Sequence, residues 1–180
     1  MECIKQVVKK VSAINEETRI KEGIDRTFAF SKLDAAGITS NDLVLDLLEW
    51  ANGIESLNAF MNMLDIDSII NIYSIWKSLK DELSEIEGAF DFPRTVVPLL
   101  DINGDVQYGL DTSDNSVYMV DMEADISEKI CSDYRMMVSA IDKGIELGAI
   151  FFNKEYGCFE CNDMHWQAIA KEFNIILPEN

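Results

Sequence analysis

Residues 93–122 constrain the fold more than any other stretch, because they read as three short strands joined by two tight polar turns. The dipeptide Asn103-Gly104 favours a hairpin, since both residues adopt positive φ at low cost. Between the turns, apolar residues alternate with open positions, as they do in a strand with one buried face. The pattern predicts consecutive antiparallel strands at Thr95–Leu100, Val106–Leu110 and Val117–Met122. Such a sheet needs helices packed against it.

Apolar residues recur at three- and four-residue steps on both sides of this meander, as they do on the buried face of a helix. The longest such run carries Tyr73 and Trp76, and we expect Trp76 to face the sheet. Helices are expected at about 2–18, 39–52, 54–64, 66–86, 126–145 and 164–173, and one further short strand at 149–152. Helices that flank a meander predict an α+β fold with a largely antiparallel sheet.

The chain has 180 residues and 48% hydrophobic content, which is enough for one buried core. We expect an N-terminal helical extension at 1–40 and the α+β domain at 41–180. The first residues lack the basic-then-apolar order of a signal peptide, and no apolar run reaches about 18 residues. Four cysteines are too few for a disulfide framework. These features predict a cytoplasmic protein with reduced thiols.

Acidic residues are concentrated in one part of the chain. Residues 41–180 hold 27 of the 33 Asp and Glu residues but only eight of the 15 Lys and Arg residues, so they carry the whole net charge of −18. A field of this sign repels nucleic acid and anionic membranes and attracts basic partners. The alternative interpretation is that the charge only maintains solubility.

A possible zinc site comprises Cys158, Cys161 and His165, which lie within eight residues of one another. Cys131 could in principle supply a fourth soft ligand. The chain has a single histidine, however, and contains no second pair of closely spaced cysteines. We therefore expect no bound metal, and we interpret these side chains as ordinary thiols near a strand and a histidine at the start of a helix.

The turn Asp101-x-Asn103-x-Asp105 matches the first half of a calcium-binding loop. The second half is missing, because Val106 stands at the glycine position and Thr112 stands where a bidentate glutamate is needed. A hairpin turn is the better interpretation. The chain also lacks the Gly-x-Ser-x-Gly elbow and the glycine-rich phosphate and dinucleotide loops, so we expect neither enzyme activity nor a cofactor.

Several short segments follow one another in a recognisable order. They are Trp50-Ala51-Asn52-Gly53, the helix with Tyr73 and Trp76, the strand Val96–Leu99 with its Asn-Gly turn, the strand Val117–Val120 and a helix from Ile126. This succession resembles the SUKH superfamily, which contains the Smi/Knr-type cell-wall regulators, Syd and many bacterial immunity proteins. The resemblance covers about residues 43–152, and it implies an SUKH-like α+β domain.

The resemblance also implies a function. Proteins of this superfamily are most often non-enzymatic binding proteins that neutralise a toxin by direct, tight association, and their contact surfaces differ from one toxin to the next. No binding residue is therefore transferred to this chain. Two alternatives stay open, namely a regulatory scaffold of the Smi/Knr cell-wall kind and a small enzyme or metal-binding protein.

The acidic composition indicates how such a partner is bound. A nuclease toxin carries a basic groove, and an acidic inhibitor gains both association rate and complementarity there. We expect a cognate basic toxin to contact a face built from the sheet turns and the end of the preceding helix, with the protein itself a monomer or weak dimer. The candidate residues are Asp81, Glu82, Glu85, Asp101, Asp105, Asp111 and Asp114, with Tyr108 as an aromatic anchor.

Overall fold

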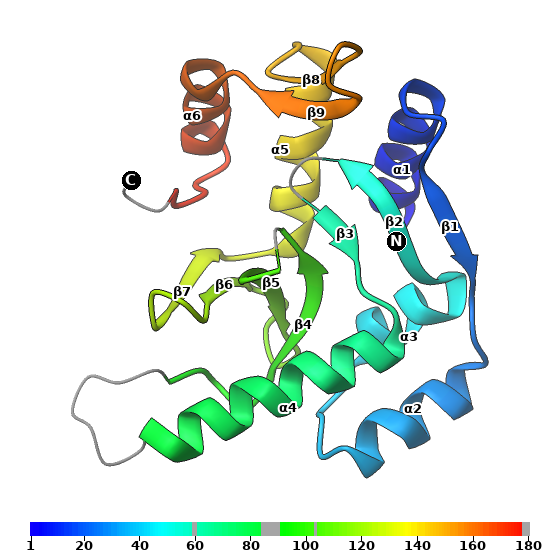
Figure 1. Ribbon diagram of the computed structural model, residues 1–180, viewed down its shortest axis with the longest axis vertical. Coiled ribbons are helices and arrows are strands. Elements are labelled where there is room, and N and C mark those ends of the chain that lie inside the picture. Colours follow the sequence, from blue (N-terminus) through cyan, green and yellow to red (C-terminus); the bar gives the residue numbers. More distant parts are fainter. Residues whose placement is uncertain (59–60, 84–90, 103, 178–180) are drawn as a thin grey trace.

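The computed structural model describes residues 1–58, 61–83, 91–102 and 104–177, which form an α+β fold and confirm the predicted fold class (Figure 1). The helices are α1 (Glu2–Ile14), α2 (Arg26–Ala35), α3 (Asp42–Trp50), α4 (Ile66–Leu83), α5 (Tyr134–Glu146) and α6 (Asp163–Glu172). The strands are β1 (Arg19–Glu22), β2 (Ala51–Asn58), β3 (Met61–Met63), β4 (Val96–Asp101), β5 (Val106–Asp111), β6 (Val117–Asp121), β7 (Ile126–Cys131), β8 (Ile150–Asn153) and β9 (Cys158–Cys161).

Strands β1 to β7 form one antiparallel sheet in the order of the sequence. The predicted meander lies within this sheet, with β4, β5 and β6 as consecutive neighbours, and it is confirmed. Val97 in β4 and Val117 in β6 both lie opposite Leu110 in β5, which fixes the register. Gly104 has a φ of 93° in the first turn and Asn115 a φ of 62° in the second, as the predicted turns require.

The segment 54–64 is built around a β-hairpin, so the helix predicted there is wrong. Helix α3 ends at Trp50, and β2 begins at the next residue. The apolar spacing that favoured a helix is too short to exclude strands, and Ile54 and Met63 lie opposite each other in the hairpin and are both buried. Pairing with β1 on one side and β4 on the other decides the conformation.

The predicted helix at 126–145 begins only at Tyr134, because the first part of this segment forms β7. Strand β7 pairs antiparallel with β6 and extends the meander by one hairpin. The carboxylate of Asp133 then accepts a hydrogen bond from the backbone N–H of Arg135 at 2.8 Å and starts α5. The prediction was wrong here because Ile126 and Ile130 stand four residues apart, a spacing that occurs in a short strand as well as in a helix.

Helix α4 covers one face of the sheet through Trp76, which is fully buried and faces the sheet as predicted. Its indole N–H donates a hydrogen bond to the side-chain oxygen of Gln107 in β5 at 3.4 Å. The next position on the same face of β5 is Gly109, where an added Cβ would lie 2.4 Å from Cγ1 of Val96. Glycine at position 109 therefore leaves room for the Val96 side chain of the neighbouring strand, and the Trp76 ring lies 3.4 Å from the position of that absent Cβ.

Helices α1, α3 and α5 cover the opposite face of the sheet. Val8 and Val11 of α1, Leu48 of α3 and Met137 of α5 are all buried in the same core. Figure 1 shows α1 (blue) beside α5 (yellow), and the two helices are in contact. Residues 1–40 thus supply two helices that enter the common core and one strand that pairs with β2.

The C-terminal part adds a small layer at one end of the molecule (Figure 1). Strands β8 and β9 form a two-stranded sheet, which includes the short strand predicted at 149–152, and α6 packs against α5. The backbone N–H of Ile176 donates a hydrogen bond to the carbonyl oxygen of Ile130 in β7 at 2.8 Å. This contact places the C-terminal segment against the β7 edge of the main sheet, while all four residues of β1 are exposed at the other edge.

Candidate partner-binding surface

The turns that carry the candidate acidic residues of the sheet lie at two opposite ends of its strands. Asp101 and Asp105 flank the β4–β5 turn, whereas Asp111 and Asp114 belong to the β5–β6 turn. Successive turns of an antiparallel meander alternate between the two ends of the sheet. These four residues therefore do not form one continuous face.

Asp111 shapes its turn and is not an exposed contact. Only 6% of its surface is exposed. One carboxylate oxygen accepts hydrogen bonds from the backbone N–H and the hydroxyl of Ser113, at 2.9 and 2.6 Å. An aspartate that bonds the backbone two residues later is a common way of closing a turn. Its burial does not suit the role of a partner contact that the sequence predicted for it.

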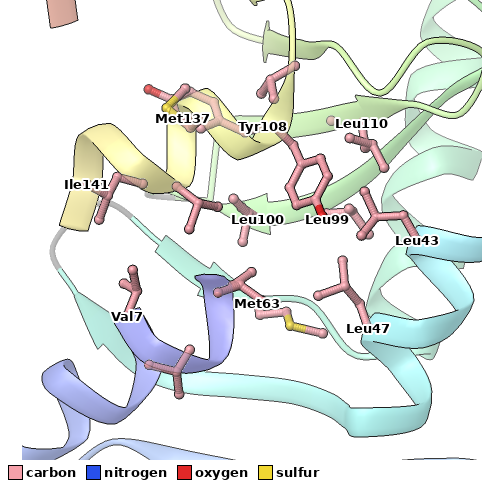
Figure 2. Close-up of a pocket in the computed structure, with 16 residues that line it drawn as sticks. Val7, Leu43, Leu47, Met63, Leu99, Leu100, Tyr108, Leu110, Met137 and Ile141 are labelled. Carbon is pink, nitrogen blue, oxygen red and sulfur yellow. The ribbon is translucent and has the colours of Figure 1, made fainter. Parts of the chain in front are cut away.

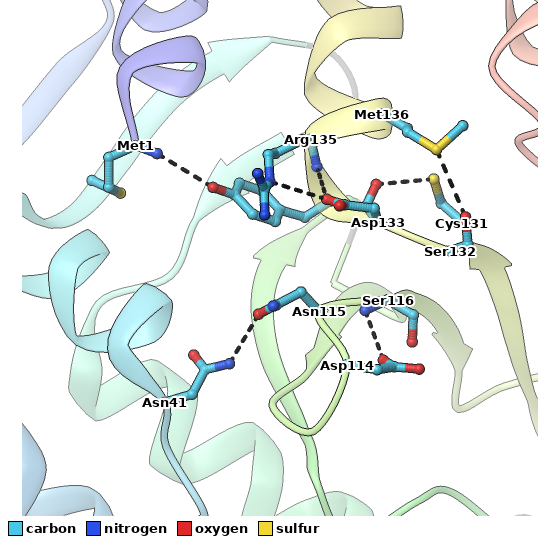
Figure 3. Close-up of polar contacts among 11 residues, drawn as sticks. Met1, Asn41, Asp114, Asn115, Ser116, Cys131, Ser132, Asp133, Arg135 and Met136 are labelled. Atoms are coloured by element: carbon cyan, nitrogen blue, oxygen red, sulfur yellow. Dashed lines mark hydrogen bonds and ion pairs between the residues drawn. The ribbon is translucent and has the colours of Figure 1, made fainter.

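Asp114 lies in the same turn and is already paired within the chain. Its carboxylate accepts hydrogen bonds from the ammonium of Lys129 at 2.8 Å and from the backbone N–H of Ser116 at 2.9 Å; the latter is drawn in Figure 3. The Lys129 hydrogen bond is the main cause that lowers the pKa of Asp114 to about 2. The pairing neutralises the charge that a basic partner would otherwise meet.

Two helices hold the β5–β6 turn in place. The side-chain amide of Asn41, the N-cap of α3, donates hydrogen bonds to the carbonyl oxygen of Thr112 and to the side-chain oxygen of Asn115, both at 3.0 Å; the bond to Asn115 is drawn in Figure 3. The backbone N–H of Tyr134, at the start of α5, donates to the carbonyl oxygen of Asn115 at 2.9 Å. This end of the sheet is therefore packed against the helical layer.

Tyr108 lies on the face of β5 that α1, α3 and α5 cover. Its side chain shares that face with Leu110 and lines an apolar cavity beneath the helices (Figure 2). Its neighbours in sequence, Gln107 and Gly109, point to the other face, toward α4. This orientation does not suit the role of an aromatic anchor on an acidic surface.

The end of α4 carries a separate group of acidic residues. Asp81 and Glu82 are exposed in its last turn, whereas Glu85 and the predicted end of the helix lie outside the described residues. Figure 1 shows this end of α4 (green) well apart from the end of β4, where Asp101 lies. Asp81 and Glu82 therefore do not extend the acidic surface of the β4–β5 turn.

Another acidic turn lies beside Asp101 and Asp105. The β6–β7 turn returns to the same end of the sheet, where the backbone N–H of Met122 donates a hydrogen bond to the carbonyl oxygen of Asp105 at 3.3 Å. It adds further carboxylates that sequence reasoning did not include. The five carboxylates of the two turns, here named the acidic turn edge, are Asp101, Asp105, Asp121, Glu123 and Asp125.

Two carboxylates of the acidic turn edge stabilise the turns that carry the others. Asp101 accepts a hydrogen bond from the backbone N–H of Gly104, and Asp121 accepts one from that of Glu123, both at 3.0 Å. The side chains of Glu123 and Asp125 are exposed. Within the described ranges, Asp101, Asp121, Glu123 and Asp125 form no ion pair with a lysine or arginine. The negative charges of Glu123 and Asp125 are therefore directed into solvent.

The sequence contained a signal for the missed part of this edge. No lysine or arginine occurs between Arg94 and Lys129, although this stretch holds eight acidic residues. Because alternate turns of a meander share one end of the sheet, a fourth strand would have placed the turn at 121–125 beside the turn at 101–105. The prediction of a helix from Ile126 hid this consequence.

The possible zinc ligands are not gathered into one site. Cys158 and Cys161 stand three residues apart in β9, so their side chains point to opposite faces, and His165 is exposed in α6. The thiol of Cys131 in β7 donates a hydrogen bond to the carbonyl oxygen of Asp133 at 3.2 Å. Burial raises the pKa of Cys161 to about 11, which keeps this thiol protonated. Within the described residues, no group of three or more His, Cys, Asp or Glu side chains could hold a metal ion.

No protein-family model and no curated protein matches this chain. In the part of the chain that the structure describes, no helix is long and apolar enough to cross a membrane. The acidic turn edge is therefore interpreted from its own geometry and charge. Carboxylates held on turns of a rigid sheet offer a surface that attracts positively charged groups.

Proposed function

We propose that this protein is a non-enzymatic binding protein that neutralises a basic toxin domain in the cytoplasm by direct association, the role that the SUKH resemblance implies. The observation that carries the proposal is the acidic turn edge. Two turns that are separate in the sequence bring five carboxylates to one end of the sheet, without a lysine or arginine in either turn. The same charge disfavours nucleic acid and anionic membranes as partners.

The physical advantage of such a surface lies in the rate of association. Complementary charge steers two proteins toward productive encounters and accelerates binding at low ionic strength. The turns of the acidic edge are joined to β4, β5, β6 and β7, so their charges are held on a paired sheet before the partner arrives. Preorganised charges avoid the entropic cost of ordering a loop at the moment of binding.

The experiment uses the toxin domain encoded by the reading frame next to the gene for this protein. Its association rate with the parent protein is compared with that of a variant carrying Asp105→Lys and Glu123→Lys, across a series of salt concentrations. We expect the association rate of the variant to be lower by about tenfold or more at low salt. The difference should shrink at high salt, where screening removes the steering field. Rescue of cells that express the toxin should weaken in parallel.

The matched control carries Asp34→Lys and Glu155→Lys, two exposed positions in α2 and in the β8–β9 turn. It changes the net charge by the same amount, but Figure 1 shows both elements away from the β4–β5 turn. Equal effects of the two variants would assign the rate to overall charge and overturn the role of the acidic turn edge. Failure of the parent protein to bind the toxin domain, or the lack of such a domain beside the gene, would overturn the proposed function itself.

A further inference from the structure

One glutamine is buried in the core between the sheet and α4. Gln107 in β5 is 0% exposed, although glutamine is a residue type that is mostly exposed in proteins. A buried amide is unfavourable unless its donors and its acceptor find partners. An apolar side chain of similar length would fill this position without that requirement. The hydrogen bonds of Gln107 therefore indicate its role.

The Gln107 amide joins α4 to the β4–β5 turn. Its oxygen accepts a hydrogen bond from the indole N–H of Trp76 at 3.4 Å. Its nitrogen donates to the carbonyl oxygen of Gly104 at 2.7 Å and to the carboxylate of Asp101 at 3.3 Å. The indole N–H can only donate, and the carbonyl and carboxylate oxygens can only accept. Rotating the amide by a half turn would break all three bonds, so its orientation is fixed.

These bonds hold both backbone groups of Gly104. Its N–H donates a hydrogen bond to the carboxylate of Asp101 at 3.0 Å, while its carbonyl oxygen accepts the bond from Gln107. Gly104 itself is exposed and has a φ of 93°, and glycine exchanges this conformation for others at low cost. The turn that carries Asp101 and Asp105 is thus anchored inside the core.

The other turn of the acidic turn edge is held differently. Asp121 accepts hydrogen bonds from the backbone N–H groups of Glu123 and Ala124 at 3.0 and 2.9 Å, so this turn closes on itself. The two turns meet where the backbone N–H of Met122 donates to the carbonyl oxygen of Asp105 at 3.3 Å. Loss of the buried amide should therefore loosen the β4–β5 turn more than the β6–β7 turn.

We propose that Gln107 is a positioning residue for the acidic turn edge, because its buried amide fixes the turn that presents Asp101 and Asp105 to a basic partner. This role rests on the proposed function for the nature of that partner, whereas the anchoring of the turn is a property of the free protein. Charges that are held in place before binding avoid the cost of being ordered during association. Gln107 thus acts on recognition from inside the core, without touching the partner.

The test is Gln107→Met, which has a similar length, forms none of the three hydrogen bonds and leaves the net charge unchanged. Backbone ¹⁵N relaxation is measured on the free protein. In the variant the order parameter of Gly104 should fall from about 0.85 to below about 0.6, the range of a flexible backbone. Gly157, which is exposed in the β8–β9 turn, is the reference and should not change. An unchanged order parameter at Gly104 would overturn the proposal.

A second measurement connects the turn to binding. The dissociation constant for the toxin domain should rise by about threefold to tenfold in Gln107→Met, because the loosened turn must be ordered on association. The salt dependence of the association rate should stay that of the parent, since no charge is removed. The matched control is Val11→Ala, which destabilises the core at α1 and should leave the dissociation constant unchanged. An equal rise in this control would assign the effect to global stability and refute the role of Gln107.

The parent protein supplies a test that does not depend on the folding of a variant. The side-chain amide protons of Gln107 should exchange with solvent on the order of 100-fold more slowly than those of the exposed Gln6 and Gln167, because exchange requires the core to open. They should also show nuclear Overhauser contacts to Gly104. Fast exchange or missing contacts would overturn the proposal. If the parent does not bind the toxin domain, the proposed function fails, while the measurements on the free protein still decide whether Gln107 anchors the turn.

Discussion

Asp114 and Lys129 form an ion pair on neighbouring parts of the sheet, with 2.8 Å between the ammonium nitrogen and a carboxylate oxygen. The same ammonium lies 5.7 Å from the centroid of the Tyr118 ring, which adds a cation–π contact. The two charged side chains are 48% and 43% exposed. Water and salt therefore screen the pair, and its contribution to stability is about 0.2–1 kcal/mol.

Replacing Asp114 with Asn should lower the free energy of unfolding by about 0.5 kcal/mol at pH 7. The folded-state pKa of Asp114 is about 2, below the value of about 3.9 for an unfolded aspartate. The carboxylate therefore contributes its full stability above the unfolded pKa and loses it as the pH falls through the folded pKa. Urea unfolding of parent and variant should show a constant difference from about pH 7 to about pH 5, which disappears toward about pH 2.

Lys129→Met is the matched control for this prediction, because it removes the same ion pair from the other side. Its loss of stability at pH 7 should not add to that of Asp114→Asn in the double variant, since the pair is removed only once. A difference between parent and Asp114→Asn that is the same at pH 3 as at pH 7 would contradict the assignment.

The orientation of Tyr108 could be predicted from the sequence, because Val106, Tyr108 and Leu110 alternate with Gln107 and Gly109 along the strand. This alternation places Tyr108 on the apolar face with Leu110, as the structure confirms. The helices that cover this face could not be predicted from the alternation alone. Which atoms surround a hydroxyl depends on helices that lie far away in the chain.

At the scale of elements, local pattern predicted the meander and most of the helices but not the strands at its flanks. Helices α4 and α6 and the body of α5 have long apolar periodicity or a clear cap, and these signals are local. Strands β2, β3 and β7 exist because they pair with neighbours in the sheet, and such pairing is not visible in a short window of sequence. The acidic turn edge was only partly predicted for the same reason.

Helix α1 offers a test of how the first residues of the chain are integrated. Val11 is fully buried in the common core. Val11→Ala should lower the free energy of unfolding by about 2 kcal/mol, from lost burial and the cavity that remains. Because α1 and the sheet share one core, urea unfolding followed by far-UV circular dichroism and by tryptophan fluorescence should still give coincident transitions.

The matched control is Lys9→Ala, an exposed position of the same helix, which should change stability by no more than about 0.5 kcal/mol. If circular dichroism showed an earlier, separate loss of helix in Val11→Ala, then α1 would unfold independently. The first part of the chain would in that case be an attached segment rather than a part of the core.

At the scale of the whole molecule, acidic residues outnumber basic ones by 33 to 15. Many of the cations are already engaged, for example Lys10 with Asp142 and Glu146, Lys21 with Glu55 and Asp65, and Lys143 with Glu172. The remaining negative charges repel one another in the folded state. Raising the salt concentration from about 10 mM to about 150 mM, which shortens the screening length from about 30 Å to about 8 Å, should therefore raise the melting temperature by a few degrees.

Scanning calorimetry in sodium chloride measures this shift. The variant with Asp34→Lys and Glu155→Lys is less acidic by four charges, so its gain in melting temperature over the same range should be smaller. A melting temperature that falls as salt is added would mean that the ion pairs, which salt also weakens, outweigh the repulsion.

The two outer strands of the sheet differ in how they meet solvent, and this bears on aggregation. An open strand with unpaired backbone groups is a template on which another chain can add, unless charge or a covering segment prevents it. At β1 the exposed edge carries Arg19, Lys21 and Glu22, so an incoming strand would have to desolvate these charges. At β7 the hydrogen bond from Ile176 to Ile130 occupies part of the edge with the chain's own C-terminal segment. Long-range repulsion and local protection of each edge therefore both oppose aggregation, and shortening the chain before Ile176 would expose the backbone of β7 at Ile130.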